Sequence, residues 1–250
     1  MSPPKDTEGS TASQGHWFTT THWSLVLNAR DPASPQAAEA LEKLCRIYWY
    51  PLYAYLRRQG EDEESAKDLT QGFFARLLEK NYLAQAQRER GKFRAFLLGS
   101  LKHFAADEWD SACAQKRGGG QPLISLDDTT CEDRYRLEPV DAMDAEKLYE
   151  RQWALSLLEL ARQRLKEEYD RAGKSELYGH LKVYETGDRN GPPYAEVAAK
   201  VRLSESGVKS AVRSMRQRFL KLVREEVANT VESPAEVDAE IRYLISVISG

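Results

Sequence analysis

Apolar residues recur at helical spacing along most of this chain. Three amphipathic stripes, with apolar positions three or four residues apart, cover residues 37–58, 61–80 and 93 to about 113. The same spacing predicts a long helix over residues 142–172, closed by Gly173. No run of alternating β-branched residues is bounded by turn residues, and the short candidate strand at 123–126 is isolated. The pattern therefore predicts an all-α protein.

Glycine and proline interrupt this pattern once in the middle of the chain. Gly118, Gly119, Gly120 and Pro122 come together, and an acidic, irregular stretch follows them. Such a composition is typical of an interdomain linker. We expect a disordered tail (1–16), a first helical domain (17–117), a flexible linker (118–141), a second helical domain (142–231) and a C-terminal amphipathic helix (232–250).

The second domain carries a pattern typical of a helix-turn-helix. Pro193 precedes a short predicted helix, and Ser204 fits the N-cap of a second helix that begins at Glu205. Leu203 and Val208 occupy the positions of a hydrophobic staple. One face of the second helix is apolar, and the other is polar and basic. Its candidate DNA-contacting residues are Ser206, Lys209, Ser210, Arg213, Arg216 and Gln217.

Charge supports this interpretation locally rather than globally. The net charge of the whole chain is only -3, which says nothing about nucleic acid. Residues 200–224, however, contain eight basic side chains and the single acidic residue Glu205. A weaker basic island covers residues 88–117. The alternative for the C-terminal island is a helical hairpin whose charged face is only solvated.

Three segments of the chain contain motifs of one known family. The pattern YxEIAxxLxxSEGxVK is resembled by Tyr194, Glu196, Val197, Ala198, Leu203, Ser204, Glu205, Gly207, Val208 and Lys209. A DLxQ segment is matched by Asp68, Leu69 and Gln71, with Phe74 following. A GxFRAWL motif and the Asp after it are resembled by Gly91, Phe93, Arg94, Ala95, Phe96, Leu97 and Asp107. With these segments in the order typical of the family, the chain resembles extracytoplasmic-function sigma factors, which belong to the sigma-70 family of RNA polymerase sigma factors.

The resemblance implies a transcription initiation factor with two partners, core RNA polymerase and promoter DNA. It implies polymerase contact through Glu64, Asp68, Gln71 and Phe74, and minus-thirty-five recognition through the helix that begins at Glu205. For the minus-ten element it implies contact through Arg88, Arg90, Lys92, Arg94, Lys102 and His103. Aromatic residues beside these cations, Tyr82, Phe93 and Phe96, suit unstacked bases, although we expect at least one of the two phenylalanines to be in the core.

Two departures from the family pattern carry a cost in conformational free energy. Gly72 stands inside a helix where an acidic residue is usual, and it should cost about 0.5 to 1 kcal/mol relative to alanine. Arg202 stands in the turn where glycine is usual, and a left-handed backbone there carries a comparable penalty. Phe96 replaces the usual Trp and His103 the usual Asn.

Two alternatives stay open. A helix-turn-helix regulator that works without polymerase would use the 61–80 helix for dimerisation. A carboxylate-metal hydrolase would use Glu61, Asp62, Glu63, Glu64 and Asp68, but no P-loop, GxSxG or HExxH motif is present. We expect no enzyme activity, no cofactor and no metal.

Two further features of the sequence predict the cellular location of the protein. Cys45, Cys113 and Cys131 are far apart and predict neither a disulfide framework nor a zinc site. Residues 1–15 have no apolar run, which predicts no signal peptide and no membrane anchor. We therefore expect a cytoplasmic protein.

The C-terminal extension has its own amphipathic pattern. Ser233, Pro234 and Glu236 resemble a capping box, and one apolar stripe follows, formed by Val237, Ile241, Leu244, Ile245 and Ile248. This stripe needs a partner, either the second domain or another protein. We hypothesise autoregulation by this helix, and the sequence leaves open whether a separate anti-sigma factor exists.

Overall fold

Every regular element that the structure describes is helical. The computed structural model describes residues 35–79, 92–114, 128–138, 143–185, 191–231 and 233–249, and it contains no strand within these ranges. The elements are α2 (Pro35–Gln59), α3 (Glu63–Glu79), α5 (Phe93–Ala114), α6 (Asp128–Arg136), α7 (Ala145–Arg171), α8 (Ser175–Leu181), η2 (Lys182–Tyr184), α9 (Tyr194–Val201), α10 (Glu205–Ala228), η3 (Pro234–Glu236) and α11 (Val237–Ser249). The predicted all-α class is confirmed.

Helix α2 forms the centre of the N-terminal half. Between residues 44 and 56 every side chain except Arg46 is buried, because α3, α6 and α7 all pack against this helix. The ring of Trp49 stacks on Phe74 of α3 with centroids 5.5 Å apart, and Tyr48 meets Phe93 of α5 edge to face at 5.6 Å. A helix that is apolar nearly all round is buried nearly all round.

Gly72 allows α3 and α5 to pack closely. A Cβ atom at Gly72 would lie only 3.2 Å from the Phe104 ring of α5. The guanidinium of Arg76, one turn further along α3, lies over the same ring at 5.5 Å. The helix-propensity cost expected from the sequence is therefore accompanied by a packing function, which a single-helix argument does not predict.

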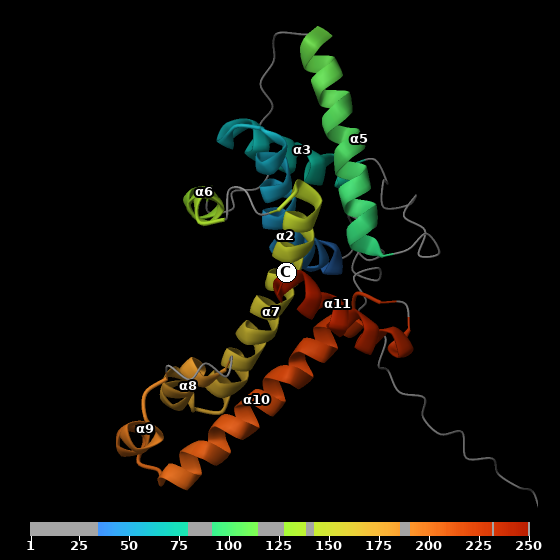
Figure 1. Cartoon of the computed structure of the whole chain (residues 1–250). Coiled ribbons are helices and arrows are strands. Elements are labelled where there is room, and N and C mark those ends of the chain that lie inside the picture. The colour runs from blue at the N-terminus through green and yellow to red at the C-terminus, as the bar shows by residue number, and fades with distance from the viewer. Residues whose placement is uncertain are drawn as a thin grey trace, which may run out of the picture.

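Helix α7 connects the two halves of the molecule. In Figure 1 it runs from α2 in the upper half to α8 and α10 in the lower half. The side chain of Asp144 accepts a hydrogen bond from the Lys147 amide at 2.7 Å and caps its first turn. Toward the other end, ion pairs join α7 to α10: Arg164 to Glu225 at 2.7 Å and to Glu226 at 2.5 Å, and Arg218 to Glu168.

Part of the predicted linker forms a helix. Within residues 118–141 the structure describes 128–138, and α6 occupies most of that range and packs on α2. Its carboxylate Glu132 is only 5% exposed and accepts hydrogen bonds from Arg57 at 2.9 and 3.0 Å and from the Tyr53 hydroxyl at 2.5 Å. A buried ion pair with α2, which is far away in sequence, therefore holds this segment in place. The predicted tail at 1–16 lies outside the described residues.

The C-terminal extension forms a helix, with two corrections. The chain enters it through the 3₁₀ turn η3, and the Ser233 hydroxyl bonds to the Glu236 carboxylate rather than capping a backbone amide. Val237 and Leu244 are buried as expected, but Ile245 is 59% exposed. Ile245 directly follows Leu244, so about 100° of helical rotation turns it away from the covered side. Instead, the carboxylate Glu240 is buried.

Candidate nucleic-acid interface

The segment from α9 to α10 is built around a turn of three residues. Helix α9 ends at Val201, Arg202 adopts a left-handed backbone with φ 55° and ψ 39°, and the Leu203 amide donates to the Ala198 carbonyl at 3.1 Å. Ser204 is extended, and its Oγ accepts from the Gly207 amide at 3.1 Å. The predicted cap and the predicted start at Glu205 are confirmed. Of the two residues at the predicted staple positions, Val208 is fully buried and Leu203 is 42% exposed.

The left-handed residue gives a test of this turn. We expect Arg202→Gly to raise the free energy of unfolding by up to about 1 kcal/mol, because glycine adopts this conformation without the Cβ penalty. Urea unfolding followed by circular dichroism measures the change. Arg202→Ala keeps the Cβ atom and should bring no gain; an equal gain in both variants would show that the backbone conformation is not the cause.

The two faces of α10 differ sharply in exposure. Its inner face consists of Val208, Val212, Met215 and Leu222, each of which is at most 2% exposed. Helices α7, α8, α9 and α11 all pack against α10. Exposed residues gather on the opposite side: Ser206, Lys209, Ser210, Arg213, Ser214 and Gln217. Five of the six predicted DNA-contacting residues of this helix therefore lie on one open face.

Arg216 is the exception among the predicted residues. It is half-buried, and its Nε donates to the backbone carbonyl of Tyr184 at 2.6 Å. The contact fixes α10 to the turn η2 and removes Arg216 from the open face. Arg218 and Arg224 are likewise paired within the protein, with Glu168 and Asp238. Within the basic island of the sequence, Arg216, Arg218 and Arg224 thus bind within the protein, whereas Lys209 and Arg213 lie on the open, outward face of α10.

The outward face keeps two cations. Lys209 pairs with Glu205 one turn earlier at 2.7 Å, and both side chains are more than half exposed. A surface pair of this kind contributes little and exchanges easily for another anion. Arg213 is exposed and forms no ion pair with any residue that the structure describes. Lys209 and Arg213, one turn apart, can therefore reach an external anion.

The ring of Tyr184 sets the position of α9. Its hydroxyl donates to the Pro192 carbonyl at 2.5 Å, and its ring lies 4.9 Å from that of Tyr194, the first residue of α9. Tyr184 is only 4% exposed, so it has no room to move. A Cβ atom at Gly191 would lie 2.7 Å from its Cε1. The absence of a side chain at 191 therefore permits this contact.

We expect Gly191→Ala to lower the free energy of unfolding by about 1 to 3 kcal/mol, because it overpacks a fixed ring. Chemical denaturation measures the loss. Gly179→Ala is a matched control, since a Cβ atom at this position in α8 meets nothing within 4 Å. A loss of equal size in both variants would argue against the proposed contact.

The residues expected at the minus-ten element do not share one surface. Arg88 and Arg90 lie outside the described residues. Lys102 and His103 are exposed on α5, and Lys102 pairs with Glu146 of α7. Lys92 is half-exposed and Arg94 is buried, and both are paired with Glu240 of α11. In this conformation the two cations at the start of α5 are both engaged by Glu240.

The aromatic residues of α5 divide as the sequence suggests. Phe93 is 1% exposed and packs in the core against Tyr48. Phe96 is partly buried and stacks on Phe93 with centroids 6.0 Å apart. The expectation that at least one of them is a core residue is confirmed by Phe93, which presents no open ring face to a base.

The predicted polymerase-contacting residues lie on α3 with different exposure. Glu64 and Asp68 are exposed and four residues apart, on one face of the helix. Gln71 is half-buried. Phe74 is fully buried and stacked on Trp49, so it presents no surface to a partner in this structure. The DLxQ motif gives the positions of these residues along α3, whereas packing against α2 determines which side of α3 is buried.

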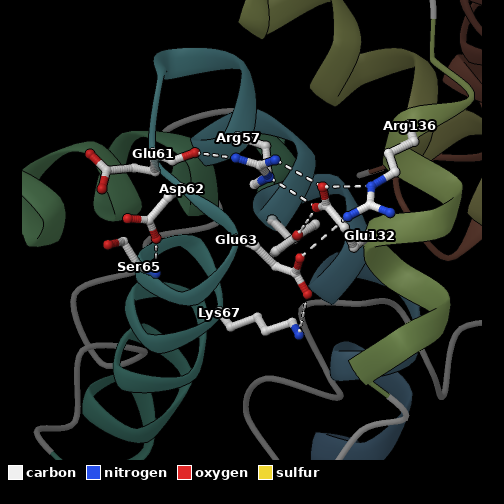
Figure 2. A network of polar contacts seen from close by, with 9 residues as sticks. Arg57, Glu61, Asp62, Glu63, Ser65, Lys67, Glu132 and Arg136 are labelled. Atoms are coloured by element: carbon white, nitrogen blue, oxygen red, sulfur yellow. Dashed lines mark hydrogen bonds and ion pairs between the residues drawn. The ribbon is translucent and has the colours of Figure 1, made fainter.

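Two of the acidic residues considered for a metal, Asp62 and Glu63, have structural partners. Figure 2 shows Asp62, whose carboxylate accepts from the Ser65 amide at 2.7 Å and so caps α3. Glu63 pairs with Lys67 at 2.9 Å and with Arg136 of α6 at 3.8 Å. Within the described residues no group of three or more His, Cys, Asp or Glu is placed to hold a metal ion.

The network around Glu132 was not predicted from the sequence. Figure 2 shows the Arg57 guanidinium of α2 between the Glu132 carboxylate of α6 and the backbone carbonyl of Glu61. The Arg57 hydrogen bonds lower the pKa of Glu132 from 4.5 to about 2, although burial opposes this. Burial and the bond to Glu132 raise the pKa of Tyr53. Glu132 is therefore ionised at neutral pH.

Among the described residues, no helix is both long enough and apolar enough to cross a lipid bilayer. Comparison with protein-family models, with curated proteins and with solved structures finds no match to this chain.

Proposed function

We propose that this chain is a transcription initiation factor of the extracytoplasmic-function sigma type, which binds core RNA polymerase and directs it to specific promoters. The observation that carries the proposal is the outward face of α10. Polar and basic side chains, Lys209, Ser210, Arg213 and Gln217, are exposed together while the opposite face of the same helix is buried. A single helix with this arrangement fits the width of the DNA major groove.

In this proposal α9, the turn at Arg202 and α10 form a helix-turn-helix that reads the minus-thirty-five element. Ser206, Lys209 and Arg213 lie in the N-terminal half of α10, which is the part that reaches base edges in such motifs. The left-handed turn and the Ser204 cap fix the angle between the two helices. The backbone amides at the start of α10 add a further attraction for phosphate.

The N-terminal half supplies the proposed contact with polymerase. Glu64 and Asp68 form an open acidic face on α3, and their neighbours Ala66 and Thr70 are buried. We infer two functional units, α2, α3 and α5 in one and α8, α9 and α10 in the other, with α7 between them. A protein with this function acts in the cytoplasm, where polymerase and chromosome are found.

Reconstitution with core RNA polymerase tests the proposal. We expect the chain to co-elute with core polymerase and to support run-off transcription from duplexes selected out of a random library. Asp68→Lys should weaken co-elution, whereas Glu167→Lys, at an exposed carboxylate of α7, should not. Selective duplex binding without polymerase binding would favour a regulator that acts alone. The absence of both activities would contradict the proposal.

A further inference from the structure

Helix α11 lies against the first turn of α5. Figure 1 shows α11 in dark red beside the lower end of the green helix α5, and the ion pairs from Glu240 to Lys92 and Arg94 identify that end as its N-terminus. The two segments are 146 residues apart in sequence at Arg94 and Glu240. The contact joins the C-terminal extension to the residues expected at the minus-ten element.

The guanidinium of Arg94 is buried between α11 and α7. It is bound by Glu240 of α11 and, at 2.7 Å, by Glu150 of α7. The rings of Trp153 and Tyr243 lie 4.2 and 4.8 Å from its central carbon. Burial opposes the charged form of Arg94, but the two carboxylates outweigh it and raise its pKa. Arg94 is therefore a buried cation that depends on its anionic partners.

Glu240 makes the contact specific. It is 2% exposed, and its two carboxylate oxygens are shared between Lys92 and Arg94. A carboxylate that receives charge-assisted hydrogen bonds from a lysine and an arginine has the same chemistry as a backbone phosphate in that place. Two anions cannot occupy the same donors at once, so Glu240 and a DNA phosphate exclude each other here.

The packing of α11 leaves the contact open to displacement. A cleft of about 610 Å³ lies between α11, α5 and α7. Its lining residues are Leu98 of α5, Met143 just before α7, Glu146, Lys147 and Glu150 of α7, and Tyr243, Ser246 and Val247 of α11. An interface with such a gap forgoes part of the dispersion energy of a closed core. The outer ion pair from α11, Asp238 to Arg224, has both side chains more than half exposed.

We propose that α11 is an internal inhibitor of minus-ten contact, in which the Glu240 carboxylate occupies the Lys92 and Arg94 cations in place of a promoter phosphate. The proposal rests on the function proposed above. In the same conformation Glu64 and Asp68 on α3 are exposed. The closed protein is therefore ready to bind polymerase, and α11 leaves α5 when promoter DNA arrives.

Hydrogen exchange on the full chain tests the displacement without any substitution. We expect the backbone amides of 237–249 to be protected in the free protein and in the complex with core polymerase. In the complex with polymerase and a selected promoter duplex, this protection should be lost. Unchanged protection in a complex that transcribes would overturn the proposal while leaving the proposed function intact. Failure to bind polymerase or to transcribe would contradict the function itself.

A pair of variants tests the role of the carboxylate. In the assembled polymerase complex, Glu240→Gln should bind a labelled random-sequence single-stranded oligonucleotide at least about fivefold more tightly than the unmodified chain. Glu236→Gln removes the same charge from the exposed turn η3 and should leave affinity unchanged. Equal affinities for all three proteins would overturn the proposal. If Glu240→Gln fails to fold, the hydrogen-exchange result decides.

Discussion

Replacing Glu132 by glutamine should lower the free energy of unfolding by about 3 kcal/mol at neutral pH. This carboxylate is buried, and it accepts hydrogen bonds from two nitrogens of the Arg57 guanidinium and from the Tyr53 hydroxyl. Glutamine keeps the size of the side chain but removes the charge, which leaves the guanidinium half-buried without its anion. Urea unfolding of the two proteins measures the difference. Asp133→Asn, at the exposed next position, is the control and should change little.

The same network predicts how the difference depends on pH. The pKa of Glu132 is about 2 in the folded protein and 4.5 without its partners. A lowered pKa stabilises the folded state above pH 4.5, and this contribution is lost as pH falls toward 2. The gap between the two proteins should therefore shrink from about 3 kcal/mol at pH 7 to about half or less at pH 3. A gap that stays constant over this range would show that the charge of Glu132 is not the cause.

The double variant Lys209→Ala, Arg213→Ala should weaken binding of the polymerase complex to a selected promoter duplex by roughly 30-fold or more, because each cation contributes about 1 to 3 kcal/mol when it contacts a base edge. If both bind phosphates instead, the slope of log affinity against log salt should fall by about 2. Fluorescence anisotropy over a salt series separates these outcomes.

A matched pair of cations controls for net charge. Lys166→Ala, Arg171→Ala removes two exposed positive side chains from α7, away from the outward face of α10. This control should bind the duplex as the unmodified protein does. If both double variants lose affinity equally, long-range attraction rather than the α10 face would explain the effect, and the assignment of Lys209 and Arg213 would be wrong.

Local patterns in the sequence predict a helix and its buried face well where the interactions involved lie within a few residues of one another. Ser204 caps α10, and Val208 and Val212 are buried on its inner face, because a serine cap and a three-and-four apolar spacing act within a few residues. Lys209 and Arg213 are exposed for the same reason. The left-handed turn at Arg202 is also local.

Polar contacts between distant segments could not be predicted in this way. Glu132 lies in an acidic stretch that looks irregular, and its partner Arg57 is 75 residues away. Arg94 has the appearance of a DNA-contacting cation, but Glu240 covers it from 146 residues away. An apolar stripe shows which side of a helix will be covered, whereas a charged residue gives no indication of which other charge will reach it.

Phe74 and Arg216 show the same limit at shorter range. The family resemblance implied a polymerase contact for Phe74, and the polar pattern of the helix placed Arg216 among the DNA contacts, yet Phe74 stacks on Trp49 and Arg216 binds the Tyr184 carbonyl. In each case a neighbouring element, α2 or η2, engages the side chain. The spacing fixes the side of the helix, and the packing fixes its exposure.

Hydroxyl-radical cleavage from α10 can locate this helix on promoter DNA. Ser210→Cys, in a chain whose own cysteines are replaced, would carry an iron chelate on the exposed face between Lys209 and Arg213. In a transcribing complex with core polymerase, we expect strand cuts in the duplex around the minus-thirty-five element, and none from Lys182→Cys on η2. Cuts confined to the melted region, or no cuts from position 210 while transcription proceeds, would contradict the proposed role of α10.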